Sequence, residues 1–327
     1  MDSLLFAINA VAPIMLMMVV GYCLKKWGLM DGVFGKAANR LVFHVFLPVM
    51  LFLNIYKTDH LGGMKLGYIG YVMVVVTVIF LCAIPYSMAV ARKKESRGAL
   101  LQGAFRSNYA LIGIPLAQSL FGEEGVLVAS LLSAAVVPYF NALAVVSLSL
   151  FRKGEKPNVK RILLGICQNP LIQGIAAGLL VVGMRVLFER WGIDFRLSDV
   201  KPVYRVLEDL AKLATPMALL VLGAQFEFSA VKELRREIVC GTVMRTVLVP
   251  LLGIGGAYLL FRNQLSGAHF AAFVAVFATP VSVSSVPMAQ EMEADVTLAG
   301  QLVVWTTLFS ALSVFLVSFL LRLAGIF

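Results

Sequence analysis

The chain has 327 residues, of which 60% are hydrophobic and 14% charged. Soluble proteins have about 45–50% apolar and about 25% charged residues, so this composition excludes a soluble fold and predicts an all-α membrane protein. The net charge of +10 would indicate nucleic acid in a soluble protein, but the basic residues here gather in short loops between apolar runs. Such loops orient membrane spans. We therefore expect membrane lipid around the chain and no nucleic-acid partner.

The four cysteines stand singly, without a CxxC pair or a histidine at metal-ligand spacing. We expect no disulfide, no metal and no cofactor. The amino terminus has Asp2 followed by an apolar run that ends in Lys25 and Lys26. A cleavable signal has the opposite order of charge, so this run is predicted to stay as the first span, with its amino end outside.

Ten apolar runs reach the length of about 20 residues that crosses a bilayer. They lie near 3–24, 38–56, 66–91, 97–119, 124–151, 163–188, 203–226, 236–261, 267–291 and 295–324. With the amino end outside, the inner loops carry 16 Lys and Arg residues and the outer loops and ends carry 9. This bias predicts a multi-pass protein of the cell membrane with both termini outside.

A polar connector at 153–162 divides the chain into a first repeat, 1–152, and a second, 163–327. Five spans on each side force the second half to enter the membrane upside down, so we predict two inverted five-helix repeats. Leu47-Pro48 in the second span and Thr215-Pro216 in the seventh occupy matching places. A single such proline more often reflects packing, but the shared order along both halves supports duplication.

Spans four and nine contain two similar stretches, 105–118 (FRSNYALIGIPLAQ) and 277–290 (FATPVSVSSVPMAQ). Both carry helix breakers: Pro115 in the first, Pro280 and Pro287 in the second. Spans broken at matching positions of two halves indicate a transporter's binding site. We predict that helices four and nine are broken and cross, with unwound backbone at 112–115 and 284–287.

A proline in the first turn of a new helix leaves free N–H groups and a positive dipole end near the middle of the membrane, which favours an anion. Neutral donors around that point can hold a carboxylate, although any one serine can instead bond to its own helix. The candidate substrate-binding residues are Ser107, Asn108, Tyr109, Gly113, Ile114, Asn141, Ser282, Ser284, Ser285 and Val286, with Thr279 as a further hydroxyl.

Three ionisable residues are candidates for charge recognition or coupling: Arg106, Arg245 and His44. Each arginine lies nine residues beyond an inner basic residue, which is about 13 Å at about 1.5 Å per residue. An arginine at that depth indicates function, with snorkelling to the inner surface as the alternative. His44 is either a proton carrier or a packed residue. Na⁺ or H⁺ stays open as a coupling ion.

Neither crossover contains Asp or Glu, which argues against cation antiport. The chain also lacks an HExxH motif and a convincing catalytic pair, so we predict no enzyme. The favoured reading is a carrier of small organic anions. A sodium- or proton-coupled symporter of bile acids or sterols and an anion channel remain alternatives.

The pattern Arg-Ser-Asn-Tyr-Ala-x-Ile-Gly-Ile-Pro at 106–115, with Thr215-Pro216 and Arg245, resembles the auxin efflux carrier family. Its bacterial malonate or malate permeases are the most similar members. The resemblance implies a ten-span fold like that of bile acid symporters and sodium/proton antiporters. It implies a scaffold of spans 1, 2, 6 and 7, a transport part of spans 3–5 and 8–10, and usually a homodimer.

The same resemblance implies secondary active transport of a small carboxylate by an elevator motion, with Asn108 on the substrate carboxylate. The chain departs from the plant members in its second crossover, where Pro280 and serines replace an asparagine. We therefore expect a carboxylate smaller than the auxin-like aromatic ones, such as malonate or malate.

Overall fold

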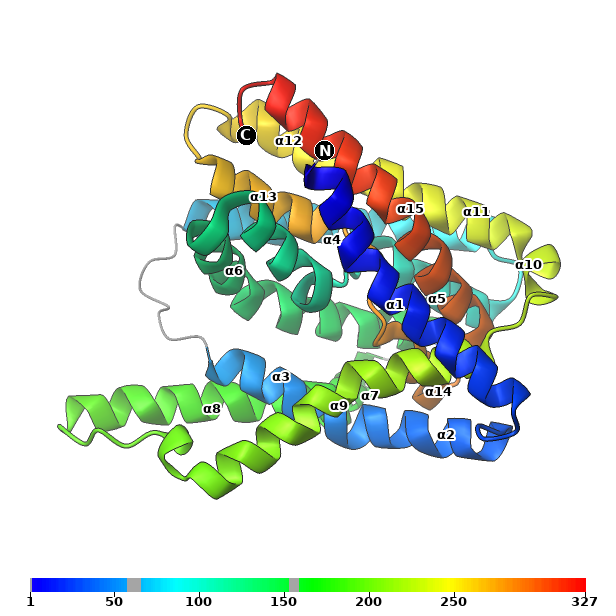
Figure 1. The fold of residues 1–327 in the computed structure, drawn as a ribbon, viewed down its shortest axis with the longest axis horizontal. Coiled ribbons are helices and arrows are strands. Elements are labelled where there is room, and N and C mark those ends of the chain that lie inside the picture. The colour runs from blue at the N-terminus through cyan, green and yellow to red at the C-terminus, as the bar shows by residue number, and fades with distance from the viewer. Residues whose placement is uncertain (1, 58–65, 153–158) are drawn as a thin grey trace.

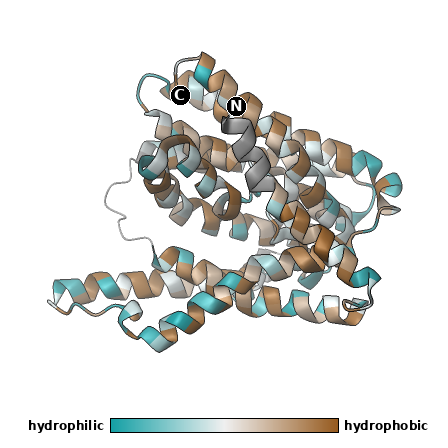
Figure 2. Ribbon diagram, viewed as in Figure 1, coloured by the Kyte–Doolittle hydropathy of each residue, from teal (hydrophilic) through white to brown (hydrophobic). Residues whose placement is uncertain are grey.

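The computed structural model describes residues 2–57, 66–152 and 159–327, whose regular secondary structure is helical, with no strand among them. Six helices of this part of the chain are long and apolar enough to cross a membrane (Figure 2). They are Gly32–Tyr56, Gly67–Val90, Tyr109–Leu150, Pro170–Arg190, Arg235–Phe261 and Val296–Leu323. An all-α multi-pass membrane protein is thus confirmed, whereas the division into ten spans and two inverted repeats stays a prediction. Most of the predicted connector, 153–158, lies outside the described residues.

At two places in the first half, a turn of π-helix directly precedes a proline-containing helix start. The helices are α1 (Asp2–Lys26), α2 (Gly32–Leu41), α3 (Leu47–Tyr56), α4 (Leu66–Val90), α5 (Lys94–Phe105) and α6 (Ile114–Leu150). The π-turns η1 (Val42–Phe46) and η2 (Tyr109–Gly113) directly precede Leu47-Pro48 and Ile114-Pro115. Proline has no N–H and its ring clashes with the carbonyl four residues back, so a widened turn lets the helix continue. Inside α6, Phe121 and Gly122 leave helical geometry, with φ of 55° at Gly122.

The second half has the same mixture of long and interrupted helices. Its elements are α7 (Val159–Gln168), α8 (Pro170–Arg190), η3 (Leu197–Asp199), α9 (Lys201–Gln225), α10 (Ala230–Glu233), α11 (Arg235–Val243), η4 (Met244–Leu248), α12 (Val249–Phe261), α13 (Gly267–Phe277), α14 (Ser285–Glu291) and α15 (Val296–Leu323). The π-turn η4 again precedes a proline, Pro250. Asn169 caps α8 by accepting the N–H of Leu171 at 2.9 Å.

The helices form two layers in Figure 1, with α2, α3, α8 and α9 in one and α4 to α6, α11 to α13 and α15 in the other. Glycines let helices touch backbone to backbone: a Cβ on Gly174 of α8 would lie 2.4 Å from the Pro48 oxygen of α3. A Cβ on Gly223 of α9 would lie 1.9 Å from the Met18 oxygen of α1. Close backbone approach through small residues is how membrane helices pack tightly. The pairs α3 with α8 and α1 with α9 are therefore firmly joined.

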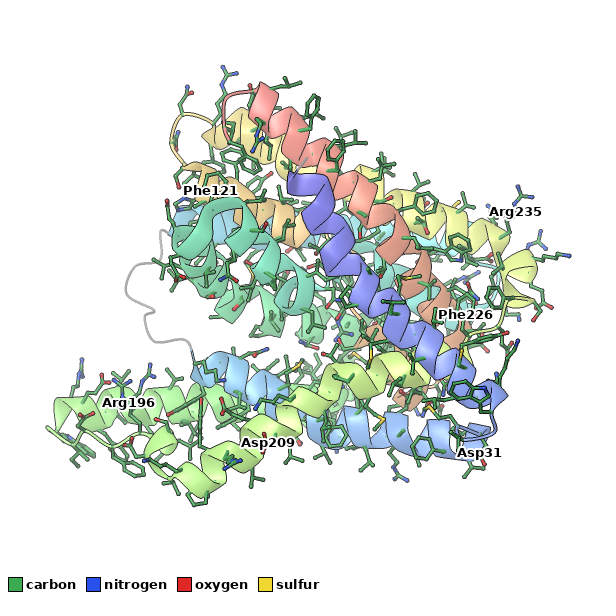
Figure 3. The ribbon with its side chains drawn as sticks, in the orientation of Figure 1. Asp31, Phe121, Arg196, Asp209, Phe226 and Arg235 are labelled. Carbon is green, nitrogen blue, oxygen red and sulfur yellow. The ribbon has the colours of Figure 1, made fainter. Side chains whose placement is uncertain are left out.

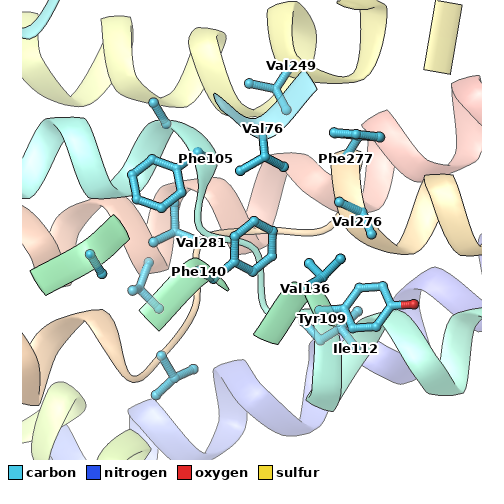
Figure 4. Close-up of a cluster of buried hydrophobic side chains, with 14 of the residues drawn as sticks. Val76, Phe105, Tyr109, Ile112, Val136, Phe140, Val249, Val276, Phe277 and Val281 are labelled. Atoms are coloured by element: carbon cyan, nitrogen blue, oxygen red, sulfur yellow. The ribbon is translucent and has the colours of Figure 1, made fainter. Parts of the chain in front are cut away.

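Buried aromatic and aliphatic side chains form a cluster in the layer that contains α4 to α6 and α11 to α13 (Figure 4). The Phe105 ring lies 5.5 Å from Phe80 and 6.2 Å from Phe140, and all three are buried. This packing fixes the end of α5. Figure 3 shows Arg196 and Arg235 at opposite ends of the molecule, beyond the apolar middle.

Candidate functional site

The interrupted parts of the two predicted crossovers lie against each other. Between α5 and η2 and between α13 and α14 the chain is not helical, and Ser107 forms an antiparallel bridge with Val281. The N–H of Asn108 donates to the Pro280 oxygen at 2.8 Å, and the N–H of Ser282 donates to the Arg106 oxygen at 3.2 Å. Each segment thus satisfies backbone groups of the other, which is what non-helical backbone at membrane depth requires.

Of the three predicted helix-break prolines, Pro280 lies in non-helical backbone, whereas the backbone at Pro115 and at Pro287 is helical. Residues 112–115 are helical, as are Ser285–Glu291 around Pro287, so both predicted positions are wrong. The first break is at Arg106–Asn108, since Ile112 N–H already donates to the Asn108 oxygen at 3.0 Å. Pro115 follows the π-turn η2 directly, so the helical backbone runs on from Tyr109 into α6 without a break at the proline. The first-turn N–H groups are therefore those that follow Asn108, starting at Tyr109.

Arg245 joins the carboxyl ends of the two broken helices. Its Nε donates to the Thr279 oxygen at 2.9 Å and its Nη2 to the Val276 oxygen at 2.8 Å, both at the end of α13. Its Nη1 donates to the oxygens of Phe105 at 3.2 Å and Ala104 at 3.4 Å, at the end of α5. A cation at two helix carboxyl ends offsets their negative dipole ends. Arg245 thus belongs to the framework of the crossing, and it does not line the cavity described below.

Arg106 lies on the other side of the crossing and contacts only neutral groups. Its Nη2 donates to Asn141 Oδ1 at 2.7 Å and to Ser284 Oγ at 2.9 Å. Its Nη1 lies 3.1 Å from Met288 Sδ and 3.4 Å from Gln102 Oε1. Arg106 is 2% exposed, and no described carboxylate forms an ion pair with it. Neutral acceptors satisfy its N–H groups without cancelling its charge, so the site is electropositive.

A cavity of about 50 Å³ opens beside Arg106, between the two helix layers. The crossing segments and α6 contribute Arg106, Ser107, Asn108, Tyr109, Asn141, Ser282 and Ser284. The Ser107 Oγ and the Asn108 Nδ2 are buried and have no hydrogen-bond partner in the protein. A buried donor without a partner costs about 1–3 kcal/mol. A ligand with acceptor atoms would relieve that cost, and a carboxylate also matches the charge.

The other predicted site residues lie close by but outside the cavity lining. Gly113 packs against α13, where a Cβ would lie 3.0 Å from Ala275, and Ile114 begins α6. Ser285 and Val286 belong to the first turn of α14. Pro280 lies in the non-helical segment between α13 and α14, whereas Pro287 is inside α14. Tyr109 lines the cavity, but its hydroxyl donates to the Ala129 oxygen at 2.8 Å.

His44 lies in η1, away from the cavity lining. Its Nδ1 is 3.0 Å from the Arg40 oxygen and 4.0 Å from Glu291 Oε2, and its side chain is 43% exposed. His44 therefore projects from η1 toward Glu291 at the end of α14. A direct role at the cavity does not follow from this position.

The far wall of the cavity was not predicted from the sequence. It consists of Leu47, Met50 and Leu51 of α3, Leu171 of α8, and Ala214, Thr215 and Ala218 of α9. The matching motifs Leu47-Pro48 and Thr215-Pro216 lie in or beside two of these segments, those of α3 and α9. These motifs were the available signal, but apolar residues of this kind look like ordinary core in a sequence.

Two interrupted helices that meet beside a cavity with one polar wall, within a helical membrane protein, indicate a membrane transporter. A model of a family described as "Membrane transport protein" matches residues 6–161 and 158–318. The chain belongs to this family, as the resemblance predicted.

Two archaeal proteins are similar along nearly the whole chain. An "Uncharacterized transporter" of Methanothermobacter thermautotrophicus is 25% identical over 308 residues, covering 93% of this chain and 95% of its own. "Uncharacterized transporter MJ1031" of Methanocaldococcus jannaschii is 22% identical over 317 residues, with the same coverage of 93% and 95%.

Proposed function

We propose that the protein is a secondary active transporter of small organic anions, mono- or dicarboxylates such as malonate or malate. The observation that carries the proposal is the charge of Arg106, buried without a carboxylate partner beside the unpartnered donors of Ser107 and Asn108. Arg106 supplies the charge and Asn108 donates to the carboxylate. A helix amino end next to them, at Tyr109, adds to the attraction.

An elevator-type alternating access is part of the proposal, with α1, α2, α3, α7, α8 and α9 as the fixed part. It is supported by the glycine contacts that join α3 to α8 and α1 to α9, and by the position of the cavity between this group and the crossing. The cavity of about 50 Å³ suits a small carboxylate better than a sterol. Its titratable lining residues are Arg106 and Tyr109, a poor set for acid–base catalysis.

Uptake of carboxylates into proteoliposomes tests the function. Asn108→Ala removes a hydrogen bond to a charged group, worth about 1.5–3 kcal/mol, so the affinity should fall about tenfold or more. Asn263→Ala, in the exposed turn after α12, is the matched control and should transport normally. Unchanged uptake by folded Asn108→Ala protein would reject the site. The same vesicles, with and without a sodium gradient, separate a coupled from an uncoupled carrier.

The membrane location and assembly are further parts of the proposal. The distribution of loop charges supports the cell membrane with both termini outside. A homodimer rests on the resemblance to the auxin efflux carriers.

A further inference from the structure

The two walls of the cavity differ sharply in polarity. The crossing segments and α6 supply its cation and nearly all its hydrogen-bonding side chains. The wall from α3, α8 and α9 is apolar apart from the Thr215 hydroxyl, and no second cation lies among the lining residues. A ligand held by its carboxylate at Arg106 therefore turns its remaining atoms toward aliphatic side chains.

We infer that the transported anion has one carboxylate and a short apolar chain. This narrows the proposed function and rests on it. A second carboxylate at the apolar wall would lose its hydration with one hydroxyl in exchange, and burial of an unpaired carboxylate is strongly unfavourable. Methyl groups at the same place gain by leaving water.

The short side chains of the far wall limit the length of the ligand's apolar chain. Ala214 and Ala218 are buried, at 0% and 3% exposure, and their short side chains leave the space that the cavity occupies. About 50 Å³ holds roughly four water molecules, since one water needs about 10–15 Å³. A short chain of a few carbons is therefore the apolar part that we propose for the ligand.

Malonate and 3-methylbutanoate make a size-matched test of this inference. The two anions share one heavy-atom skeleton, and two methyl groups replace the oxygens of the second carboxylate. Their binding to the purified protein is measured from the rise in unfolding temperature with ligand concentration. The assay uses about pH 8, well above ordinary carboxyl pKa values, and competition for uptake into proteoliposomes is the second readout.

We expect 3-methylbutanoate to bind at least about tenfold more tightly than malonate, a difference of about 1.4 kcal/mol. A smaller ratio, or a preference for malonate, overturns this inference and leaves the proposed function in place. Failure of both anions to bind or to be taken up counts against the proposed function itself.

A cation added to the apolar wall should reverse the preference. Met50 of α3 is half-buried and lines the cavity, so Met50→Lys gives the second carboxylate of malonate a partner. Met292→Lys, after α14 and outside the cavity lining, is the control for added charge. An unchanged preference in folded Met50→Lys protein would place the ligand elsewhere. If that variant does not fold, the comparison of malonate with 3-methylbutanoate on the wild-type protein still tests the inference.

Discussion

Two buried arginines that look equivalent in the sequence differ in what they contact. Arg245 donates to four carbonyl oxygens at the ends of α5 and α13. Arg106 donates to side chains and faces the cavity. Removal of Arg245 leaves buried carbonyls without donors, whereas removal of Arg106 leaves Asn141 and Ser284 free to bond to a neutral replacement. One arginine therefore holds the crossing together, and the other supplies charge.

We predict that Arg245→Gln and Arg106→Gln separate stability from transport. Hydrogen bonds from a charged group contribute about 1.5–3 kcal/mol each, so Arg245→Gln should destabilise the protein by several kcal/mol. Arg106→Gln should change the unfolding temperature little and abolish anion binding. Thermal unfolding in detergent and ligand-induced shifts measure both effects. A stable Arg245→Gln variant, or carboxylate binding by Arg106→Gln, would contradict these roles.

At the scale of elements, α8 shows how one helix uses glycine in two ways. Gly174 faces α3, where a Cβ would lie 2.4 Å from the Pro48 oxygen. Gly183, further along the same helix, has open space around a Cβ. The contact at Gly174 is backbone to backbone, so neither side can give way by a rotamer change.

The matched changes Gly174→Ala and Gly183→Ala should have opposite effects on stability. Gly183→Ala is expected to be neutral or to stabilise by up to about 1 kcal/mol, because alanine is the better helix former. Gly174→Ala must separate α8 from α3 and should lower the unfolding temperature, at a cost of about 1–3 kcal/mol typical of overpacking. Equal unfolding temperatures for the two variants would mean that α3 and α8 are not joined as described.

At the scale of the whole molecule, the two helix groups also meet through polar side chains. Asn39 of α2 is fully buried, and its Nδ2 donates to Gln290 Oε1 of α14 at 2.7 Å. The same nitrogen lies 3.5 Å from Gln225 Oε1 of α9. The first contact joins the proposed fixed part to a broken helix, and the second stays within the fixed part.

Alternating access between the groups predicts that these two contacts respond differently to crosslinking. In a background without the native cysteines, Asn39→Cys with Gln290→Cys should lose uptake when a short bifunctional thiol reagent joins the pair. Asn39→Cys with Gln225→Cys should keep uptake after the same treatment. Transport that continues with residues 39 and 290 fully crosslinked would exclude relative motion of the two groups.

Part of the site could be predicted because a local signal marks it. The helix breakers in 105–118 and 277–290 identified both interrupted segments, and Asn108 and Arg106 follow from their position within them. The place of the first break could not be predicted from Pro115, because a π-turn absorbs the missing N–H there. The non-helical backbone at Arg106–Asn108 is stabilised by the hydrogen bond from the Asn108 N–H to the Pro280 oxygen, which belongs to the other segment.

The sequence alone determined that the chain is a helical membrane protein and which stretches are interrupted, because span length, apolarity and proline act over neighbouring residues. Only the tertiary structure decided the roles of the two arginines and the apolar far wall of the cavity. Those depend on contacts such as that of Arg245 with Phe105, 140 positions apart in the chain. Contacts of that range arise from packing of whole helices, which no local pattern of residues records.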